Sequence, residues 1–151
     1  MLIIDQATYD AIVAHARRDH PDEACGVVAG PEGSDRPERF IPIPNAAMSP
    51  TYYEFSSDDL IKLHNELWDR DEEVVVTYHS HTATEAYPSR TDIARAEEPN
   101  SHYVLVSTRD GADQQSYDGP VEFRSFRILD GVVTEEEVKV VAAYSDELGE
   151  S

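Results

Sequence analysis

The sequence predicts one domain of mixed α/β (α+β) class, and three observations support this. The chain has 151 residues, the length of a typical single domain. Of these, 40% are hydrophobic, enough to build a core and too many for a disordered chain. Helix-like and strand-like segments are mixed without the regular alternation of parallel βαβ units. We expect the domain to span residues 1–144 and a flexible acidic tail to occupy residues 145–151.

The spacing of apolar residues predicts three helices. Asp5 caps the first, which Pro21 brings to an end. The second begins at Ser57, and five residues are expected on its apolar face: Leu60, Ile61, Leu63, Leu67 and Trp68. The third is shorter and spans Ser89–Glu98.

Short apolar or β-branched runs predict the strands. The run Val74–Tyr78 is β-branched and is expected to be a central strand. The other expected strands are Leu2–Ile4, Ala24–Ala29, Phe40–Ile43, Tyr52–Phe55, Tyr103–Val106, Glu122–Leu129 and Val132–Val141. Two segments rich in Gly, Pro, Asp or Ser are expected to be loops, Gly30–Arg36 and Asp110–Pro120.

The composition excludes several classes of partner. Lys and Arg number 12 against 31 Asp and Glu, so the formal net charge is −19. Nucleic acids and anionic membranes are disfavoured, since both bind through clustered Lys and Arg. No apolar stretch approaches about 18 residues and no signal-like leader opens the chain, so we expect a cytoplasmic protein without a membrane span. A protein partner would meet a basic or apolar face, with four arginines as candidates: Arg90, Arg95, Arg124 and Arg127.

A candidate metal site follows the central strand. His79 and His81 are two residues apart at the end of that strand, so both imidazoles point to one face. A loop that turns back would bring Asp92 to the same point. Two nitrogens and one oxygen form a three-ligand set that leaves the fourth zinc position open for water. Water bound to zinc at such a site has a pKa of about 7.

Hydrolysis also requires a proton carrier and an oxyanion donor. Glu23, directly before the strand Ala24–Ala29, is the candidate for the first role, and Ser89 for the second. A structural alternative stays open, because Ser89 and Asp92 also fit a capping box at a helix start. The two roles are compatible. The sequence by itself does not place Glu23 beside His79.

The remaining unusual residues have plainer interpretations. The chain has one cysteine, Cys25, so an internal disulfide and a Cys-rich zinc site are excluded. We expect Cys25 to pack as a small hydrophobe. A hydrolase that uses the Cys25 thiol is a minor alternative. His64 is expected on the polar edge of the second helix and His102 on the surface. His15 and His20 do not share a helix face. Two acidic clusters are expected to be solvated, Asp71–Glu73 and Glu135–Glu137.

These residues together resemble a known signature. Glu23 followed by His79-x-His81-x7-Ser89-x2-Asp92 is similar to the complete motif of the JAMM metalloproteases, also called MPN-plus or JAB. Within this family the chain resembles the bacterial Mec group of CysO-cysteine peptidases. The phrases that carry the likeness are "AHARRDHPDEACGVVAGPEGSDRPERFIP", "YHSHTATEAYPSRTD" and "HYVLVSTRD". The likeness extends over residues 2–141.

The resemblance implies a cytidine-deaminase-like fold, with a curved mixed sheet flanked by helices. It implies one zinc ion on His79, His81 and Asp92, Glu23 as general acid and base, and Ser89 as oxyanion donor. The implied substrate is a ubiquitin-like sulfur-carrier protein ending in Gly-Gly, from which cysteine is released. Alternatives are the trimming of a C-terminally extended carrier precursor and a non-catalytic MPN-type interaction module.

A Gly-Gly tail requires a narrow groove and a strand edge to which an extended chain can add. We expect both in Asn45–Phe55, with four apolar or aromatic contacts: Met48, Tyr52, Tyr53 and Phe55. The alternative, that these side chains only fill the core, stays open. A zinc nucleoside deaminase is excluded, because that chemistry uses a Pro-Cys-x-x-Cys segment and the chain has one cysteine.

Overall fold

A six-stranded mixed sheet forms the centre of the protein, which a computed structural model describes over residues 1–109 and 121–143. Only β4 and β5 are parallel neighbours; the other neighbouring pairs are antiparallel. The strands, in their order across the sheet, are β3 (Arg39–Ile43), β2 (Cys25–Pro31), β4 (Glu72–His81), β5 (His102–Ser107), β6 (Glu122–Leu129) and β7 (Val132–Glu136). The expected loop Asp110–Pro120 and the expected tail lie outside the described residues.

A second, two-stranded sheet pairs the two ends of the domain. Here β1 (Leu2–Asp5) runs parallel to β8 (Val138–Val141). The expectation of one strand over Val132–Val141 is therefore wrong. After the turn at Asp130 and Gly131, both with positive φ, β7 pairs with β6. At Glu137 the chain leaves β6, and the Glu137 carbonyl accepts the Leu2 N–H at 2.8 Å.

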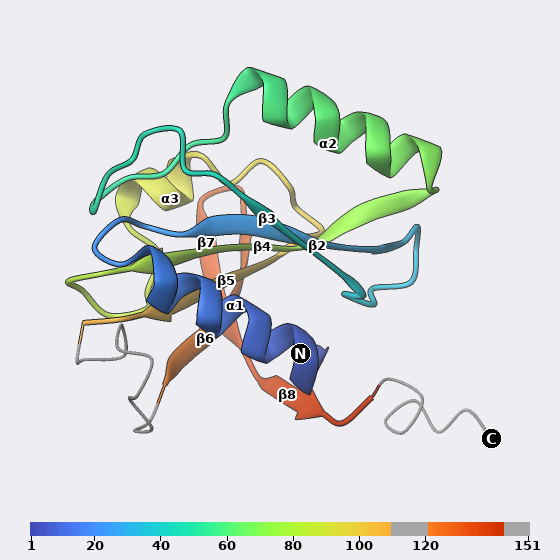
Figure 1. Cartoon of the computed structure of the whole chain (residues 1–151). Helices are drawn as coiled ribbons and strands as arrows, with labels where there is room; N and C mark the ends of the chain where they lie inside the picture. Colours follow the sequence, from blue (N-terminus) through green and yellow to red (C-terminus); the bar gives the residue numbers. More distant parts are fainter. Residues whose placement is uncertain (110–120, 144–151) are drawn as a thin grey trace.

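Helices cover both faces of the large sheet, as Figure 1 shows. Helix α1 (Gln6–Asp19) packs with one core cluster, which includes Val28, whereas α2 (Ser57–Asp69) packs with another, which includes Val27. Because neighbouring residues of a strand point to opposite faces, α1 and α2 lie on opposite sides of the sheet. The short helix α3 (Arg90–Ala94) lies near a third cluster, built on β5 and β6.

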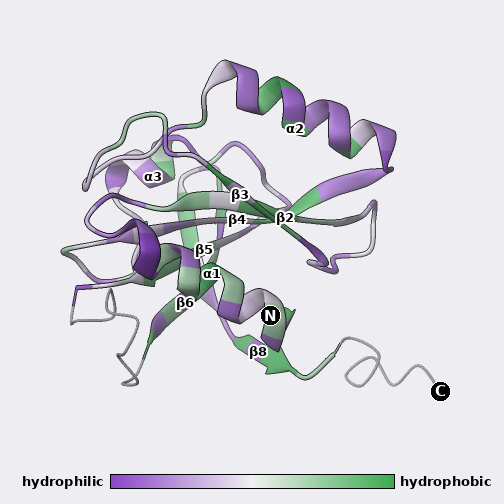
Figure 2. Cartoon of the chain, in the orientation of Figure 1, coloured by the Kyte–Doolittle hydropathy of each residue, from purple (hydrophilic) through white to green (hydrophobic). Residues whose placement is uncertain are grey.

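The helix starts agree with the sequence, but the apolar face of α2 does not. Asp5 caps α1 by accepting the Thr8 N–H. On α2 only Leu63 and Leu67 are buried. The other three residues of its expected apolar face are exposed by 36%, 59% and 84%: Leu60, Ile61 and Trp68. The helix touches the sheet along one narrow stripe, and Figure 2 shows most of its length as hydrophilic.

Two further expectations are corrected by local hydrogen bonds. Tyr52–Phe55 is not a strand, because the Asn45 side chain holds this segment by donating to the Tyr52 carbonyl and accepting the Glu54 N–H. The third helix ends at Ala94 rather than Glu98. Beyond it, the Glu98 N–H donates to the Tyr103 hydroxyl instead of continuing the helix. Among the described residues, no helix has the length and apolar character needed to cross a bilayer.

Candidate metal centre

Strand alternation places both predicted histidines on one face. His79 and His81 end β4, on the side of the sheet that faces α2 and α3, while Tyr78 between Thr77 and His79 belongs to the core beneath α1. Parallel pairing with β5 holds this end of β4, with His79 opposite Leu105. Both imidazoles are 5–6% exposed and therefore nearly buried.

Helix α3 returns the third ligand to the same point. Ser89 caps the helix by accepting the Asp92 N–H at 3.1 Å, and Asp92 Oδ2 accepts the Ser89 N–H at 2.8 Å. The capping box is therefore present, and it fixes the carboxylate. Oδ1 lies 3.2 Å from His79 Nε2, and Oδ2 lies 3.1 Å from His81 Nε2. Asp92 therefore takes part in the cap and also lies within reach of both imidazoles.

The loop between β4 and α3 is fixed at several points. The Glu85 carbonyl lies 2.9 Å from His81 Nδ1. The Ser107 hydroxyl donates to the Thr84 carbonyl at 2.6 Å, and the N–H of the buried Ala86 donates to Glu122 at 2.7 Å. When His81 Nδ1 donates to Glu85, its Nε2 is left with a free lone pair, as metal-bound histidines require.

The three side chains fit a metal ion. Their ligand atoms lie within 4.8 Å of one another, and no other such group occurs in residues 1–109 and 121–143. The Nε2 of His79 is buried without a hydrogen-bond partner, a costly state that a bound cation would relieve. Burial lowers the pKa of His79, which favours the neutral form that binds metals. Burial alone would raise the pKa of Asp92, but the two adjacent imidazoles and the Ser89 N–H hold it well below its usual range.

Glu23 lies at the same site. It precedes β2, where its N–H donates to the Ser49 carbonyl at 2.9 Å and its own carbonyl accepts from Asn45 at 3.0 Å. The next residue, Ala24, is tied to β4 by two hydrogen bonds with Ser80. Strand pairing thus brings Glu23 to the end of β4, a placement that the sequence did not determine.

Glu23 has the properties of a proton carrier. Its side chain is 5% exposed and lines a pocket of about 270 Å³ together with His81, Ser89 and Asp92. Burial raises the pKa of Glu23 to about 7, with the Asp92 charge acting in the same direction and His81 opposing it. A carboxyl group with a pKa near neutrality exchanges protons in both directions. The Ser89 hydroxyl hydrogen is not used in the cap and is free to donate into the pocket.

Of the four expected tail contacts, two line this pocket. The Tyr53 ring stacks on His79 at 4.5 Å between ring centroids, and Tyr52 lines the pocket beside it. Phe55 instead packs against the cluster beneath α2. Met48 is 76% exposed and lines neither this pocket nor the second pocket described next.

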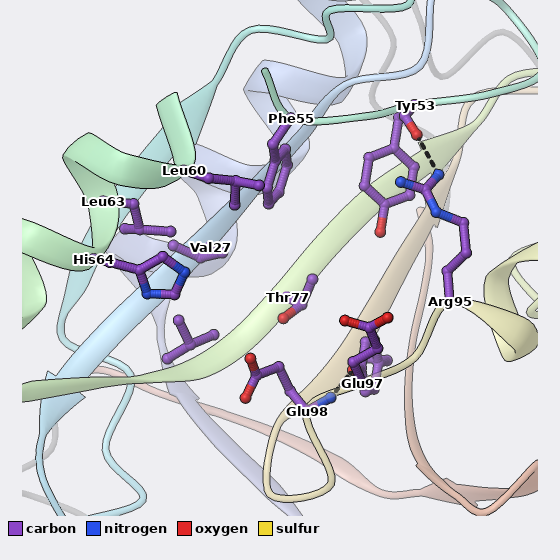
Figure 3. A pocket seen from close by; sticks show the side chains of 12 residues that line it. Val27, Tyr53, Phe55, Leu60, Leu63, His64, Thr77, Arg95, Glu97 and Glu98 are labelled. Carbon is purple, nitrogen blue, oxygen red and sulfur yellow. Dashed lines mark hydrogen bonds between the residues drawn. The ribbon is translucent and has the colours of Figure 1, made fainter. Parts of the chain in front are cut away.

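A second pocket adjoins the first, and Figure 3 shows it at close range. Its volume is about 190 Å³, and it lies between α2 and the segment that follows α3. One side is apolar, formed by Val27, Phe55, Leu60 and Leu63, and the other carries Glu97 and Glu98. Tyr53 and Arg95 line both pockets, so these two residues mark the boundary between them.

Arg95 was expected as one of four arginines that would meet a protein partner. Its guanidinium lies 4.9 Å from the Tyr52 ring centroid and 5.6 Å from that of Tyr53, and Nη1 donates to the Tyr53 carbonyl at 2.7 Å. Its position three residues after Asp92 is the sequence signal that would have placed it here. Arg124, by contrast, is paired with Glu135 and Glu85 away from the two pockets.

Several interpretations of the remaining residues need correction. His102 is not on the surface: it is fully buried, with Nδ1 2.6 Å from Glu136 and Nε2 2.7 Å from Asp35. Glu136 is likewise not solvated, since its side chain is 8% exposed. Glu72, also expected in solvent, pairs with Arg39 at 2.8 Å. Partners from distant segments bury these groups.

Other expectations are confirmed. Cys25 is fully buried, and burial raises its pKa to about 12, so it packs as a hydrophobe and does not supply a thiolate. His64 is exposed on α2. His15 lies on the other face of the sheet, with Nδ1 2.7 Å from the Tyr78 hydroxyl, and His20 Nδ1 lies 2.7 Å from the Thr108 hydroxyl.

The fold and this site define a JAB-domain protein. A family model described as prokaryotic homologs of the JAB domain matches residues 5–128, and the chain belongs to this family. The CysO-cysteine peptidase of Mycobacterium tuberculosis is 60% identical over 144 residues, which cover 95% of this chain and 94% of the relative. The desampylase of Haloferax volcanii is 30% identical over 124 residues, or 79% and 88% of the two chains.

The fold is also found among solved structures. The crystal structure of a JAB1/MPN domain protein from Archaeoglobus fulgidus superimposes with a TM-score of 0.57 at 18% identity, over 93% of this chain and 99% of that chain. The mixed sheet flanked by helices is therefore the JAB/MPN fold, as the resemblance implied.

Proposed function

We propose that the protein is a zinc-dependent peptidase that hydrolyses the amide bond after the C-terminal Gly-Gly of a ubiquitin-like sulfur-carrier protein and releases cysteine. One observation carries the proposal. The three candidate metal ligands lie within 4.8 Å of one another, and two of them line one pocket with the buried Glu23, in a chain that is 60% identical to a CysO-cysteine peptidase over 95% of its length. The relative named desampylase supports a small ubiquitin-like protein as substrate.

Zinc is the proposed metal because two imidazoles and one carboxylate form a preferred catalytic zinc set. Bound there, the ion supplies Lewis acidity and a water of lowered pKa. Glu23 takes one proton from the attacking water and later gives it to the departing cysteine nitrogen, so that one water is consumed and an acid and an amine are formed. The Ser89 hydroxyl donates a hydrogen bond to the oxyanion that develops on the scissile carbonyl oxygen.

The same chemistry would trim extra C-terminal residues from a carrier precursor, so precursor trimming is the second candidate. The non-catalytic alternative is disfavoured, because the chain keeps all three candidate ligands, within 4.8 Å of one another, together with Glu23. The cytoplasm is the proposed location, as sulfur carriers and free cysteine are components of intracellular metabolism.

The test is the intact mass of a Gly-Gly carrier with a C-terminal cysteine, before and after incubation with the protein. We expect loss of one cysteine residue, its suppression by a zinc chelator and its recovery after zinc is restored. If the zinc-loaded protein leaves this adduct intact but shortens an extended precursor, the trimming function replaces the proposed one. Cleavage that is insensitive to chelation would contradict the metal-dependent mechanism.

A further inference from the structure

Arg95 lies at the boundary between the two pockets. Among the described residues that line the pocket of about 270 Å³ beside His81 and Asp92, here called the metal pocket, it is the one arginine or lysine, and it lines the second pocket as well. Its guanidinium packs over the rings of Tyr52 and Tyr53, and one N–H is used by the Tyr53 carbonyl. Figure 3 shows this hydrogen bond and the position of Arg95 beside Tyr53.

The guanidinium has hydrogen-bond donors to spare. An arginine carries five N–H groups in a rigid plane, and the contact with Tyr53 uses Nη1 alone. Within the described parts of the chain, Nε and Nη2 of Arg95 have no hydrogen-bond acceptor or carboxylate partner. Donors held in place between two pockets are suited to acceptors that a substrate brings.

The two pockets differ in what they can accommodate. The second pocket has an apolar wall beneath α2, which suits the side chains of a protein tail. The metal pocket is rich in hydroxyl groups, among them those of Thr51, Thr82 and Thr84, which suit the polar groups of a leaving amino acid. A tail that enters beneath α2 would therefore pass alongside Tyr53 and Arg95, which line both pockets, before it reaches the candidate metal site.

Alongside Tyr53 and Arg95, a Gly-Gly tail offers only backbone groups. Glycine has no side-chain acceptor, so the acceptor nearest the scissile carbonyl is the carbonyl of the penultimate glycine. The Tyr53 ring that Arg95 covers also stacks on His79. This contact fixes the position of Tyr53 and Arg95 relative to the candidate metal site.

We propose that Arg95 is a substrate-positioning residue that donates hydrogen bonds to the carbonyl of the penultimate glycine of the carrier tail. The proposal rests on the proposed function and adds a residue that reads the Gly-Gly backbone. Lysine would be a poor replacement, because the planar guanidinium both covers the two tyrosine rings and presents its edge donors in fixed directions.

The experiment combines two variants with two substrates. Arg95→Ala and Arg95→Lys are compared with Arg18→Ala, which removes the same charge from an exposed side chain on α1, on the opposite face. The carrier–cysteine adduct is prepared with its native Gly-Gly bond and with a trans-alkene in place of that bond, which deletes the penultimate carbonyl and the N–H of the last glycine without adding charge. The rate of cysteine release is followed by intact mass.

We expect kcat/KM on the native adduct to fall about 10- to 100-fold in Arg95→Ala, the range for one charge-assisted hydrogen bond, and less in Arg95→Lys. On the alkene adduct, the kcat/KM of the wild type should be lower than on the native adduct by a similar factor. The kcat/KM of Arg95→Ala on the alkene adduct should equal that of the wild type. Zinc content, thermal midpoint and the Arg18→Ala rates should be unchanged. If the thermal midpoint of Arg95→Ala is lowered, Arg95→Lys replaces it in the comparison, because lysine keeps the charge at the same site.

Two results would overturn the assignment. One is an equal loss in Arg95→Ala on both adducts, which would mean that Arg95 only supports the Tyr52–Tyr53 segment. The other is that Arg95→Ala loses no activity on an adduct with cysteinamide in place of cysteine. That result would mean that Arg95 binds the carboxylate of the leaving cysteine. If wild type cuts neither adduct, the proposed function fails, and that outcome is distinct from both.

Discussion

Replacing Glu23 with glutamine separates activity from stability. The change keeps the shape of a side chain that is 5% exposed and removes its ability to carry a proton. General acid–base catalysis contributes about 10²- to 10⁴-fold, so cysteine release should slow by that factor, which equals about 3–5 kcal/mol in the barrier. Metal binding should be retained, because Glu23 is not one of the three ligands.

The same substitution should make the metal-free protein more stable at neutral pH. The pKa of Glu23 is raised in the folded state from 4.5 to about 7, chiefly by burial. Between these values the unfolded chain binds fewer protons than the folded chain, so stability falls as pH rises through this window. The loss amounts to about 3 kcal/mol, or about 6–12 °C in Tm for a domain of this size.

The assay is thermal unfolding of metal-free wild type and Glu23→Gln across pH 4 to 8, about the range set by the two pKa values. The variant should lack the part of the pH dependence that Glu23 causes, and its excess stability should grow with pH. Two identical pH profiles would refute the assignment of a raised pKa. Cysteine release by Glu23→Gln within about tenfold of wild type would refute the role as proton carrier.

Three further predictions concern other residues. Asp92→Asn should weaken zinc binding by about 100-fold or more, measured by competition with a chromophoric chelator, and unchanged affinity would exclude Asp92 as a ligand. Burial alone would raise the pKa of Glu136, but hydrogen bonds from His102 and Ser125 lower it from 4.5 to about 2. It therefore contributes up to about 3 kcal/mol that is lost as pH falls from 4.5 to 2, and Glu136→Gln should show a flatter acid-unfolding curve; an equally steep curve would contradict this. Alkylating reagents should leave activity intact in the native protein because Cys25 is buried, and rapid inactivation that chelators do not prevent would support a thiol mechanism.

Local sequence patterns predicted the elements on which the site depends. The β-branched run before His79 gave the central strand, and the spacing of two residues gave the shared face of both imidazoles. The capping pattern from Ser89 to Asp92 gave the start of α3. Each of these features depends on residues close together in sequence, which is why one sequence was enough to predict them.

Long-range partners account for what the sequence did not predict. His102 is buried because carboxylates from two distant segments, Asp35 and Glu136, take both of its nitrogens. Tyr52–Phe55 satisfied a strand pattern, yet one side chain, Asn45, holds it in another conformation. Such contacts between distant positions leave no local pattern.

The apolar face of α2 shows a different limit. Helical periodicity identified five apolar positions, but the sheet beneath offers contact to a narrow stripe, and Trp68 remains 84% exposed. Periodicity gives the direction of a face and not the width of the surface that covers it. The sequence named Arg95 as a candidate partner contact but not its packing on Tyr52 and Tyr53, because these two residues approach it from a separate segment.

The central claim is that His79, His81 and Asp92 hold one zinc ion next to Glu23. Anomalous diffraction at the zinc edge, on crystals of the zinc-loaded protein, tests it directly. We expect a single strong peak at about 2.0–2.2 Å from the two Nε2 atoms and a carboxylate oxygen of Asp92. A peak on other residues, or no peak at these ligands in crystals of protein that still releases cysteine, would contradict it.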